Sequence, residues 1–214
     1  MIQVITPGMI RNRQGPFPRF SVGGSPAGDG LSLPESFEDL DQWTDAWLGD
    51  KGAGVGWIRT DADAADGIWC LAQDARGTDV IYAPEIVWEW GGDDLVVSIK
   101  NPNNAAAGVI QIRFAVNGDN TSWYAIGINA ATAAITIQRD GVIKKTRPDC
   151  PLPDNTWRDL EIHWRSVPTI TWTWRGVSDN WTDPSPFDTG GIGIVGNNNI
   201  AQPADWRVDW FRES

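Results

Sequence analysis

The chain has 214 residues and a formal net charge of −11, with 41% hydrophobic residues. This length suits one domain of the larger all-β kind and is enough to bury a full core. The charge argues against nucleic acid or an anionic membrane as a partner, because phosphates are bound by clustered Lys and Arg. The densest basic stretch is only Lys144–Lys145.

The beginning of the chain has neither the basic and apolar regions of a secretory signal nor a run long enough to span a membrane. Residues 1–32 are rich in Gly and Pro and are predicted to form an extended arm. Such an arm could add its short strands to a neighbouring subunit, or it could be a flexible tail. The next stretch, 36–48, is consistent with one short helix or with a strand and a turn.

From residue 56 onward the pattern is almost entirely β. Short runs of β-branched and aromatic residues alternate with turns. We expect strands at 56–60, 67–73, 79–90, 94–100, 108–116, 122–129, 133–139, 142–146, 157–165, 168–175, 190–196 and 205–212. This number of short strands predicts an all-β domain over 33–214, a two-sheet antiparallel jelly-roll sandwich that carries the extended N-terminal arm.

The strand alternation also predicts a polar face that a sugar could occupy. In 108–116, Ile110 and Ile112 face inward, so Gln111 and Arg113 face outward. Sugar sites combine aromatic side chains with hydrogen-bonding groups. The candidate carbohydrate-binding residues are Gln111, Arg113, Trp123, Asn129, Glu161, His163 and, in a loop, Trp181. The alternative is an ordinary solvated sheet face, and most of the fourteen tryptophans are expected to be core residues.

Five segments together have a characteristic order and spacing. They are Phe37-x-Asp39-Leu40-x-x-Trp43, DGIWCLA (66–72), NTWRDLEIHW (155–164), PFDTGGIGIV (186–195) and WRVDWF (206–211). Over about 33–212 they resemble the concanavalin A-like lectin/glucanase superfamily, the laminin-G-like jelly rolls. The resemblance implies two curved antiparallel sheets, often with a carbohydrate site on the concave face. In glucanase members an Asp of the last strand helps to hold a structural calcium, which makes Asp209 a candidate.

Glu85 and Glu89 resemble the two glutamates of the E-x-D-x-E strand in retaining members of that superfamily, but Val87 occupies the place of the central Asp. In a regular strand their Cα atoms would lie about 13 Å apart. Retaining hydrolysis needs carboxyl groups about 5–5.5 Å apart. The sequence therefore predicts a sheet strand, with Glu85, Val87 and Glu89 on one face and Ile86 and Trp88 on the other.

No other catalytic set is predicted. His163 is the only histidine, so it alone could serve a Ser–His–Asp site, and it excludes a His-rich metal site. Polysaccharide lyases of this architecture use a Tyr and a His, but Tyr82 and Tyr124 lack the surrounding motif. Cys70 reads as a core residue and Cys150 as a loop residue, and whether they pair is left open.

These patterns favour a non-enzymatic protein with no cofactor and no metal other than the calcium considered at Asp209. The predicted protein is a virion component, a minor tail or decoration protein of a bacteriophage whose host has a high-GC genome. Assembled in the host cytoplasm and displayed outside, it would contact other virion subunits through its arm and cell-surface polysaccharide through its lectin-like domain. The alternatives are a glycoside hydrolase or polysaccharide lyase and a purely structural sandwich; self-association is left open.

Overall fold

The computed structural model describes residues 37–38, 40–65, 67–74, 77–89, 94–102, 108–166, 168–187, 189–198 and 206–213. Within these residues the chain forms one short helix and fourteen strands. In chain order they are α1 (Leu40–Asp45), β1 (Leu48–Gly49), β2 (Trp57–Thr60), β3 (Cys70–Gln73), β4 (Gly77–Glu89), β5 (Leu95–Lys100), β6 (Val109–Val116), β7 (Tyr124–Asn129), β8 (Ala134–Arg139), β9 (Val142–Arg147), β10 (Arg158–Ser166), β11 (Thr169–Trp174), β12 (Val177–Thr182), β13 (Thr189–Asn198) and β14 (Arg207–Glu213). No helix in this described part is long and apolar enough to cross a membrane.

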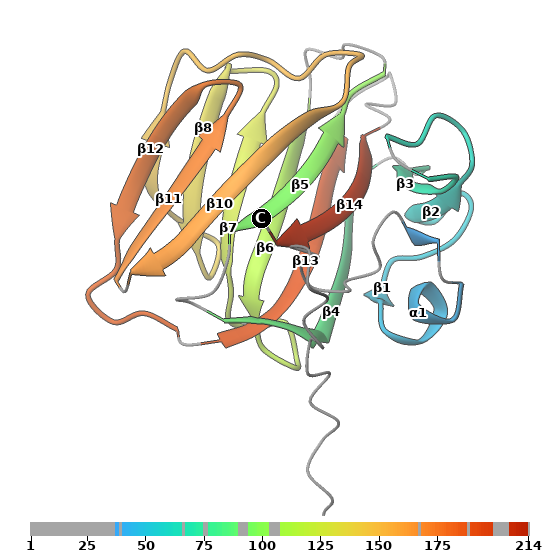
Figure 1. Ribbon diagram of the computed structural model, residues 1–214, viewed down its shortest axis with the longest axis horizontal. Helices are drawn as coiled ribbons and strands as arrows, with labels where there is room; N and C mark the ends of the chain where they lie inside the picture. The colour runs from blue at the N-terminus through green and yellow to red at the C-terminus, as the bar shows by residue number, and fades with distance from the viewer. Residues whose placement is uncertain are drawn as a thin grey trace, which may run out of the picture.

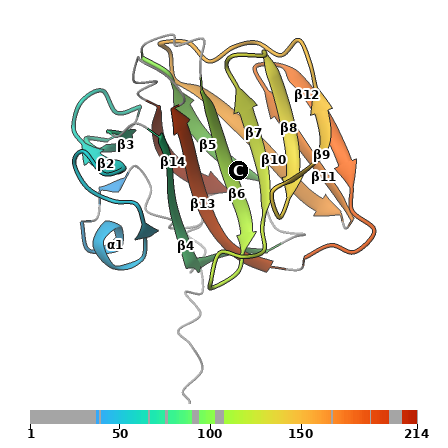
Figure 2. The ribbon, with the colours of Figure 1, turned by 180° about the vertical axis from the view of Figure 1, so that it is seen from behind.

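The strands form two sheets of seven. Sheet A has the order β1-β4-β13-β6-β7-β8-β9, and sheet B has the order β12-β11-β10-β5-β14-β3-β2. All pairings between these strands are antiparallel. Figure 1 shows sheet B in front of sheet A, and Figure 2 shows sheet A from the other side. The predicted two-sheet antiparallel jelly roll is confirmed.

All twelve predicted strand regions contain an observed strand, but β1 and β12 were not predicted. Strand β12 has the sequence VSDNWT, and its residues are half-buried or exposed. It lies at the edge of sheet B and, among the described strands, pairs only with β11. Its Val177 and Trp181 pack against the core, but the polar Asp179 between them interrupts the apolar alternation on which the prediction relied.

The core lies between the sheets and follows the predicted alternation. In β6 the side chains of Ile110, Ile112 and Phe114 are fully buried, whereas Gln111 and Arg113 are only half-buried. Strand β11 repeats the pattern, with its isoleucine and two tryptophans buried and its three threonines half-buried. The inner faces of both sheets therefore supply the apolar core, and the outer faces carry the polar side chains.

Tryptophans account for much of this core, as predicted. Seven of them are fully buried: Trp47, Trp57, Trp88, Trp164, Trp172, Trp174 and Trp206. The Trp88 and Phe114 rings of sheet A each lie 5.5–5.6 Å from the Trp164 ring of sheet B, measured between centroids. Such tilted and edge-on contacts add about 0.5–1.5 kcal/mol each to the burial of the rings, so they help to join the sheets.

The ambiguous stretch 36–48 contains the helix α1, and its last residue, Leu48, begins the two-residue strand β1. Phe37 is fully buried and packs edge-on against Trp43 and Phe211, with centroids 6.4 and 6.3 Å away. Trp47 follows α1, and its ring lies 5.8 Å from the Phe211 ring, so the aromatic side chains on both sides of the helix pack on β14. The resemblance compared the segment Phe37–Trp43 with the first strand of the superfamily; this comparison is wrong, because residues 40–45 form α1. The predicted arm, 1–32, lies outside the described residues.

Strand β4 is irregular in the stretch between Ala83 and Trp88, beside the two glutamates. Ala83 pairs with Ile192 of β13 and Trp88 pairs with Gly190, so five steps along β4 oppose two along β13. Ala83 and Trp88 are both buried in the core although an even alternation would place them on opposite faces. A bulge between them shifts the phase of the strand. The side chains of Glu85, Val87 and Glu89 lie outside the described residues.

A buried ionic cluster joins the sheets at the end where β7, β8 and β12 meet. The carboxylate of Asp183, which follows β12, is 1% exposed. It accepts hydrogen bonds from the Tyr124 hydroxyl at 2.6 Å and from Arg139 Nη1 at 2.6 and 2.8 Å. The Tyr124 oxygen in turn accepts one from the backbone N–H of Phe187 at 3.0 Å. The buried carboxylate thus has hydrogen-bond donors on both of its oxygens, and a buried charge requires such partners.

The two cysteines are both buried and do not form a disulfide. Cys70 lies on β3, and burial together with the nearby Asp209 carboxylate raises the pKa of its thiol to about 12. Burial also raises the pKa of the Cys150 thiol. Both thiols therefore stay protonated at neutral pH, and the disulfide that the sequence left open is not formed.

Removing the Asp183 carboxylate should destabilise the fold strongly. Asp183→Ala leaves Tyr124 and Arg139 without their shared acceptor, and breaking a buried ion pair costs about 3–5 kcal/mol. We expect a loss near the lower end, about 3 kcal/mol, because the Arg139 side chain is 23% exposed and can regain water. Urea denaturation of both proteins measures the difference.

The matched control is Asp179→Ala, because Asp179 also joins β12 to a cation of sheet A. Its partner Lys145 lies 2.6 Å away but is 41% exposed. Exposed pairs contribute about 0.2–1 kcal/mol, so this loss should stay below about 1 kcal/mol. Equal losses for the two variants would contradict a special role for the buried cluster.

Tyr124 should make the fold sensitive to alkaline pH. Burial, followed by the hydrogen bond to Asp183, raises the pKa of Tyr124 above its ordinary value of 10.0. The neutral phenol is thus favoured in the folded protein. Its stabilising contribution is full below pH 10 and is lost as the pH rises from there toward the folded pKa.

Tyr124→Phe removes this titration, so the stability gap between the two proteins should shrink above about pH 10. The difference in free energy of unfolding between the two proteins can decrease by up to about 1.4 kcal/mol per pH unit. Urea denaturation from pH 8 to 11.5 measures it. A gap that stays constant over this range would show that Tyr124 does not titrate differently in the two states.

Candidate functional site

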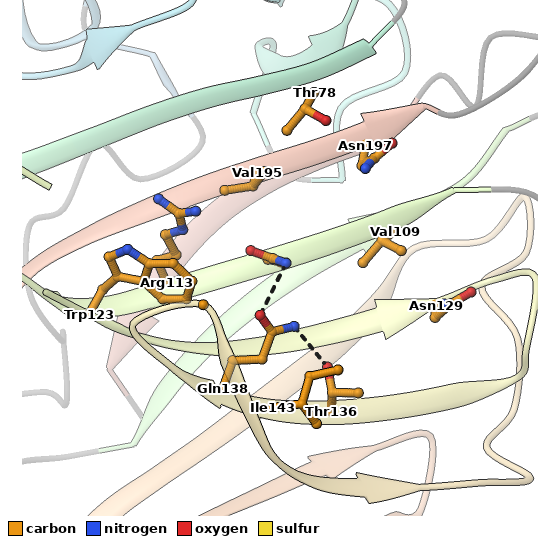
Figure 3. A pocket seen from close by; sticks show the side chains of 12 residues that line it. Thr78, Val109, Arg113, Trp123, Asn129, Thr136, Gln138, Ile143, Val195 and Asn197 are labelled. Carbon is orange, nitrogen blue, oxygen red and sulfur yellow. Dashed lines mark hydrogen bonds between the residues drawn. The ribbon is translucent and has the colours of Figure 1, made fainter. Parts of the chain in front are cut away.

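The outer face of sheet A contains a groove with a volume of about 370 Å³. Six of its strands contribute residues, β4, β6, β7, β8, β9 and β13, together with Trp123 before β7 and Gly141 in the turn between β8 and β9. Figure 3 shows the side chains that line it. The lining residues are Thr78, Val109, Gln111, Arg113, Trp123, Asn129, Thr136, Gln138, Gly141, Ile143, Val195 and Asn197. This volume is near the lower end of the range of about 300–1,000 Å³ for small-molecule sites.

Two glycines keep this part of the sheet hollow. A Cβ atom at Gly127 of β7 would lie 2.8 Å from the Thr136 hydroxyl and 3.2 Å from Gln138 Nε2. A Cβ atom at Gly193 of β13 would lie 3.0 Å from the Ile81 carbonyl oxygen. Any larger residue would push against these neighbours, so the sequence needs glycine where the groove crosses the strands.

Amide and hydroxyl side chains form a connected row across the middle of the groove. Gln111 Nε2 points at Gln138 Oε1, 3.5 Å away, and Gln138 Nε2 donates to the Thr136 hydroxyl at 3.1 Å. Both contacts are drawn in Figure 3. The Gln111 Oε1 atom is buried without a hydrogen-bond partner among the described residues. Buried polar atoms are rarely left unpaired, and sites of function are where such exceptions concentrate.

Arg113 and Trp123 form one end of the groove. The Arg113 guanidinium lies over the indole ring, 3.8 Å from its centroid, and its Nη1 donates to Asn120 Oδ1 at 3.0 Å. Figure 3 shows the two side chains together at this end. Burial lowers the pKa of Arg113 to about 10, so the side chain is still a cation at neutral pH. Trp123 is only 8% exposed, which leaves little of its ring for a ligand.

Four of the seven predicted site residues line this groove: Gln111, Arg113, Trp123 and Asn129. Asn129 lies at the opposite end from Trp123, and its Oδ1 accepts hydrogen bonds from the backbone N–H groups of Ala131 and Thr132. This side chain therefore also holds the turn between β7 and β8.

The other three predicted residues lie elsewhere. Glu161 and His163 are on β10, on the outer face of sheet B, where His163 Nδ1 lies 2.6 Å from the buried Asp94 carboxylate. Trp181 is on β12 and packs toward the core, 6.2 Å from the Tyr124 ring. These three residues therefore do not share the groove of sheet A, and their part in carbohydrate binding stays a prediction. Alternation identifies which side chains leave the core but not which of the two sheets carries them.

Several lining residues were missed by the sequence analysis. They are Thr78, Val109, Thr136, Gln138, Gly141, Ile143, Val195 and Asn197. Thr136 and Gln138 alternate with the buried Ile135 and Ile137 of β8, so their outward direction was readable from the sequence. What the sequence could not show is that β8 and β13 lie on either side of the pair β6–β7.

Asp209 was considered as a calcium ligand, and its carboxylate is fully buried. One oxygen accepts the backbone N–H of Ala65 at 2.5 Å and the other that of Trp210 at 2.8 Å. Among the described residues, no group of three or more His, Cys, Asp and Glu side chains is arranged to hold a metal ion. The calcium role of Asp209 stays a prediction.

Comparison with solved structures identifies the fold. The carbohydrate-binding module CBM66 from Bacillus subtilis superimposes with a TM-score of 0.55 at 14% identity, over 78% of this chain and 92% of that one. A β-glucanase from Bacillus licheniformis gives 0.54 at 16% identity, over 84% and 96%. A glycosidic hydrolase gives 0.50 at 12% identity, over 80% and 90%. No protein-family model matches the chain, and no curated protein matches it either. The chain has the concanavalin A-like jelly-roll fold.

Proposed function

We propose that this protein binds a glycan in the groove of sheet A and does not cleave it. The observation that carries the proposal is the groove itself, a hollow outer sheet face with a row of amide and hydroxyl side chains beside apolar ones. Sugars present hydroxyl groups around an apolar ring, and such a mixture of groups is suited to them. The fold shared with the carbohydrate-binding module CBM66 supports the same reading.

The composition of the groove supports binding over hydrolysis. Glycosidases use two carboxyl groups, about 5–5.5 Å apart in retaining enzymes and about 6.5–9.5 Å apart in inverting ones. Among the described residues, the twelve that line the groove include no Asp, Glu or His. A glycan held there would meet amides, hydroxyls and one guanidinium, none of which is a general acid or base at neutral pH.

The biological setting inferred from the sequence is part of this proposal. The protein would be a minor tail or decoration protein of a bacteriophage, attached to other virion subunits through residues 1–32. The Gly/Pro-rich composition of that segment supports an extended arm. The chain is also rich in Arg and poor in Lys, and because Arg codons are GC-rich whereas Lys codons are not, this supports a host with a high-GC genome. Detection of the protein in purified virions, or tail and capsid genes beside its gene, would test this setting.

Gln138→Ala should weaken glycan binding. The side chain links Gln111 to Thr136 in the middle of the groove, and losing a hydrogen-bonding group of this kind costs about 0.5–1.5 kcal/mol. We therefore expect an affinity about three- to tenfold lower. The ligand is first found by affinity electrophoresis in gels containing host cell-wall polysaccharides, and the affinities are then measured by calorimetry.

Glu161→Gln is the matched control because Glu161 lies on the outer face of sheet B. It should bind like the unmodified protein. A loss with Glu161→Gln but not with Gln138→Ala would move the site to the other face of the sandwich. If none of the polysaccharides retards the protein, the purely structural sandwich becomes the better description.

The alternative, a glycan-cleaving enzyme, rests on the fold shared with the β-glucanase and on Glu85 and Glu89. We expect no release of reducing sugar from β-glucans or from host polysaccharide. The test adds Glu89→Gln as a control. Turnover by the unmodified protein that this variant abolishes would establish the enzyme and contradict our proposal.

A further inference from the structure

Arg113 is the one charged side chain among the twelve described residues that line the groove. Among the described residues no carboxylate lies within 4.0 Å of it, whereas Arg139, Arg158, Arg175, Arg207 and Arg212 each have an aspartate within that distance. The partner of Arg113 is instead the neutral amide oxygen of Asn120. In a chain of net charge −11, a half-buried cation without a counter-ion is unusual.

Two similar arginine–tryptophan stacks in the same protein show what Arg113 lacks. Arg212 lies over the Trp210 ring at 3.9 Å and has the Asp159 carboxylate 3.9 Å away. Arg59 lies over Trp69 at 4.1 Å and donates to the backbone carbonyl oxygens of residues 37 and 38. Arg113 has the shortest stacking distance of the three, 3.8 Å, but its side chain makes a single hydrogen bond to the described part of the chain.

The position of Arg113 carries an electrostatic cost that a ligand could offset. Its Nε atom is buried without an acceptor among the described residues. A guanidinium partly removed from water and lacking an anion is stabilised when a carboxylate binds to it. The guanidinium also covers the Trp123 ring, so this end of the groove presents a cation where a sugar would otherwise meet an aromatic face.

We propose that the groove recognises an acidic glycan and that Arg113 pairs with the carboxylate of a uronic acid residue. This inference rests on the proposed function and adds the chemical class of the ligand. A carboxylate carries one negative charge and two oxygens in a plane, which matches the planar guanidinium. The row of Gln111, Gln138 and Thr136 is left to contact the hydroxyl groups of the same and the neighbouring sugar.

The test compares each acid with its uncharged ester. Trisaccharides of galacturonate, glucuronate and mannuronate, and the methyl ester of each, are titrated into the protein by calorimetry. The ester keeps the stereochemistry and removes the charge. We expect at least one acid to bind ten times or more as tightly as its ester. This comparison uses the unmodified protein, so it does not depend on how a variant folds.

Arg113→Gln should abolish the preference for the acid while leaving weak binding of the ester. Arg212→Gln is the matched control, since it removes an arginine that also stacks on a tryptophan but lies on sheet B. It should keep the full preference. The ratio of the affinity for the acid to the affinity for its ester is compared between Arg113→Gln and the unmodified protein. The change in this ratio measures the contact between the guanidinium and the carboxylate.

The two proposals fail in different ways. Equal affinities for acid and ester, or binding confined to neutral polysaccharides or to a sulfated trisaccharide, would overturn the uronate inference and leave glycan binding intact. If Arg113→Gln still prefers the acid to its ester, another group of the protein binds the carboxylate. If no acidic, esterified or neutral glycan binds, the proposed function itself falls.

Discussion

The structure depends on one constraint, that every central strand must bury one face against the opposite sheet. A strand alternates its side chains between two faces, so burial of Ile110, Ile112 and Phe114 forces Gln111 and Arg113 outward. The same rule applied to β8 brings Thr136 and Gln138 out beside them. The groove is thus a consequence of how the core is built, with glycine at Gly127 and Gly193 preventing the outer face from filling in.

Apolar packing alone does not hold the two sheets in place at every point. At the end near β12 the contact between them is ionic, because the Asp183 carboxylate accepts hydrogen bonds from Tyr124 and Arg139 of sheet A. Hydrogen bonds are directional, whereas packed side chains can slide against one another. We infer that the cluster fixes the position of β7 and β8 relative to sheet B, and these strands also carry groove residues.

The sequence predicted the fold well because its signals are local. Alternation in runs such as TITWTW and VIQIRFAV assigns inner and outer residues without knowledge of the partner strands. It failed where tertiary contacts decide. The edge strand β12 has a polar residue between its two inward apolar ones, and the phase change in β4 depends on its pairing with β13. The helix α1 follows Phe37, whose ring packs against Phe211 of β14.

The candidate site was predicted only in part for the same reason. Gln111, Arg113, Trp123 and Asn129 lie on or beside neighbouring strands, β6 and β7, and the structure brings them together. Glu161 and His163 satisfy the same alternation rule but belong to the other sheet, and no local pattern distinguishes the two. Residues of β4 and β13 are distant in sequence from β6, so their contribution depended on the strand order.

The groove also shares its framework with the core, and this affects how binding would proceed. Most of its side chains project from strands that are paired on both sides, as β6 is between β13 and β7, and β9 alone is an edge strand. On β6, buried residues lie one position away from the groove residues. A ligand would therefore meet a surface whose backbone is already ordered. Little conformational entropy remains to be lost by the protein, so a few weak polar contacts can suffice for measurable affinity.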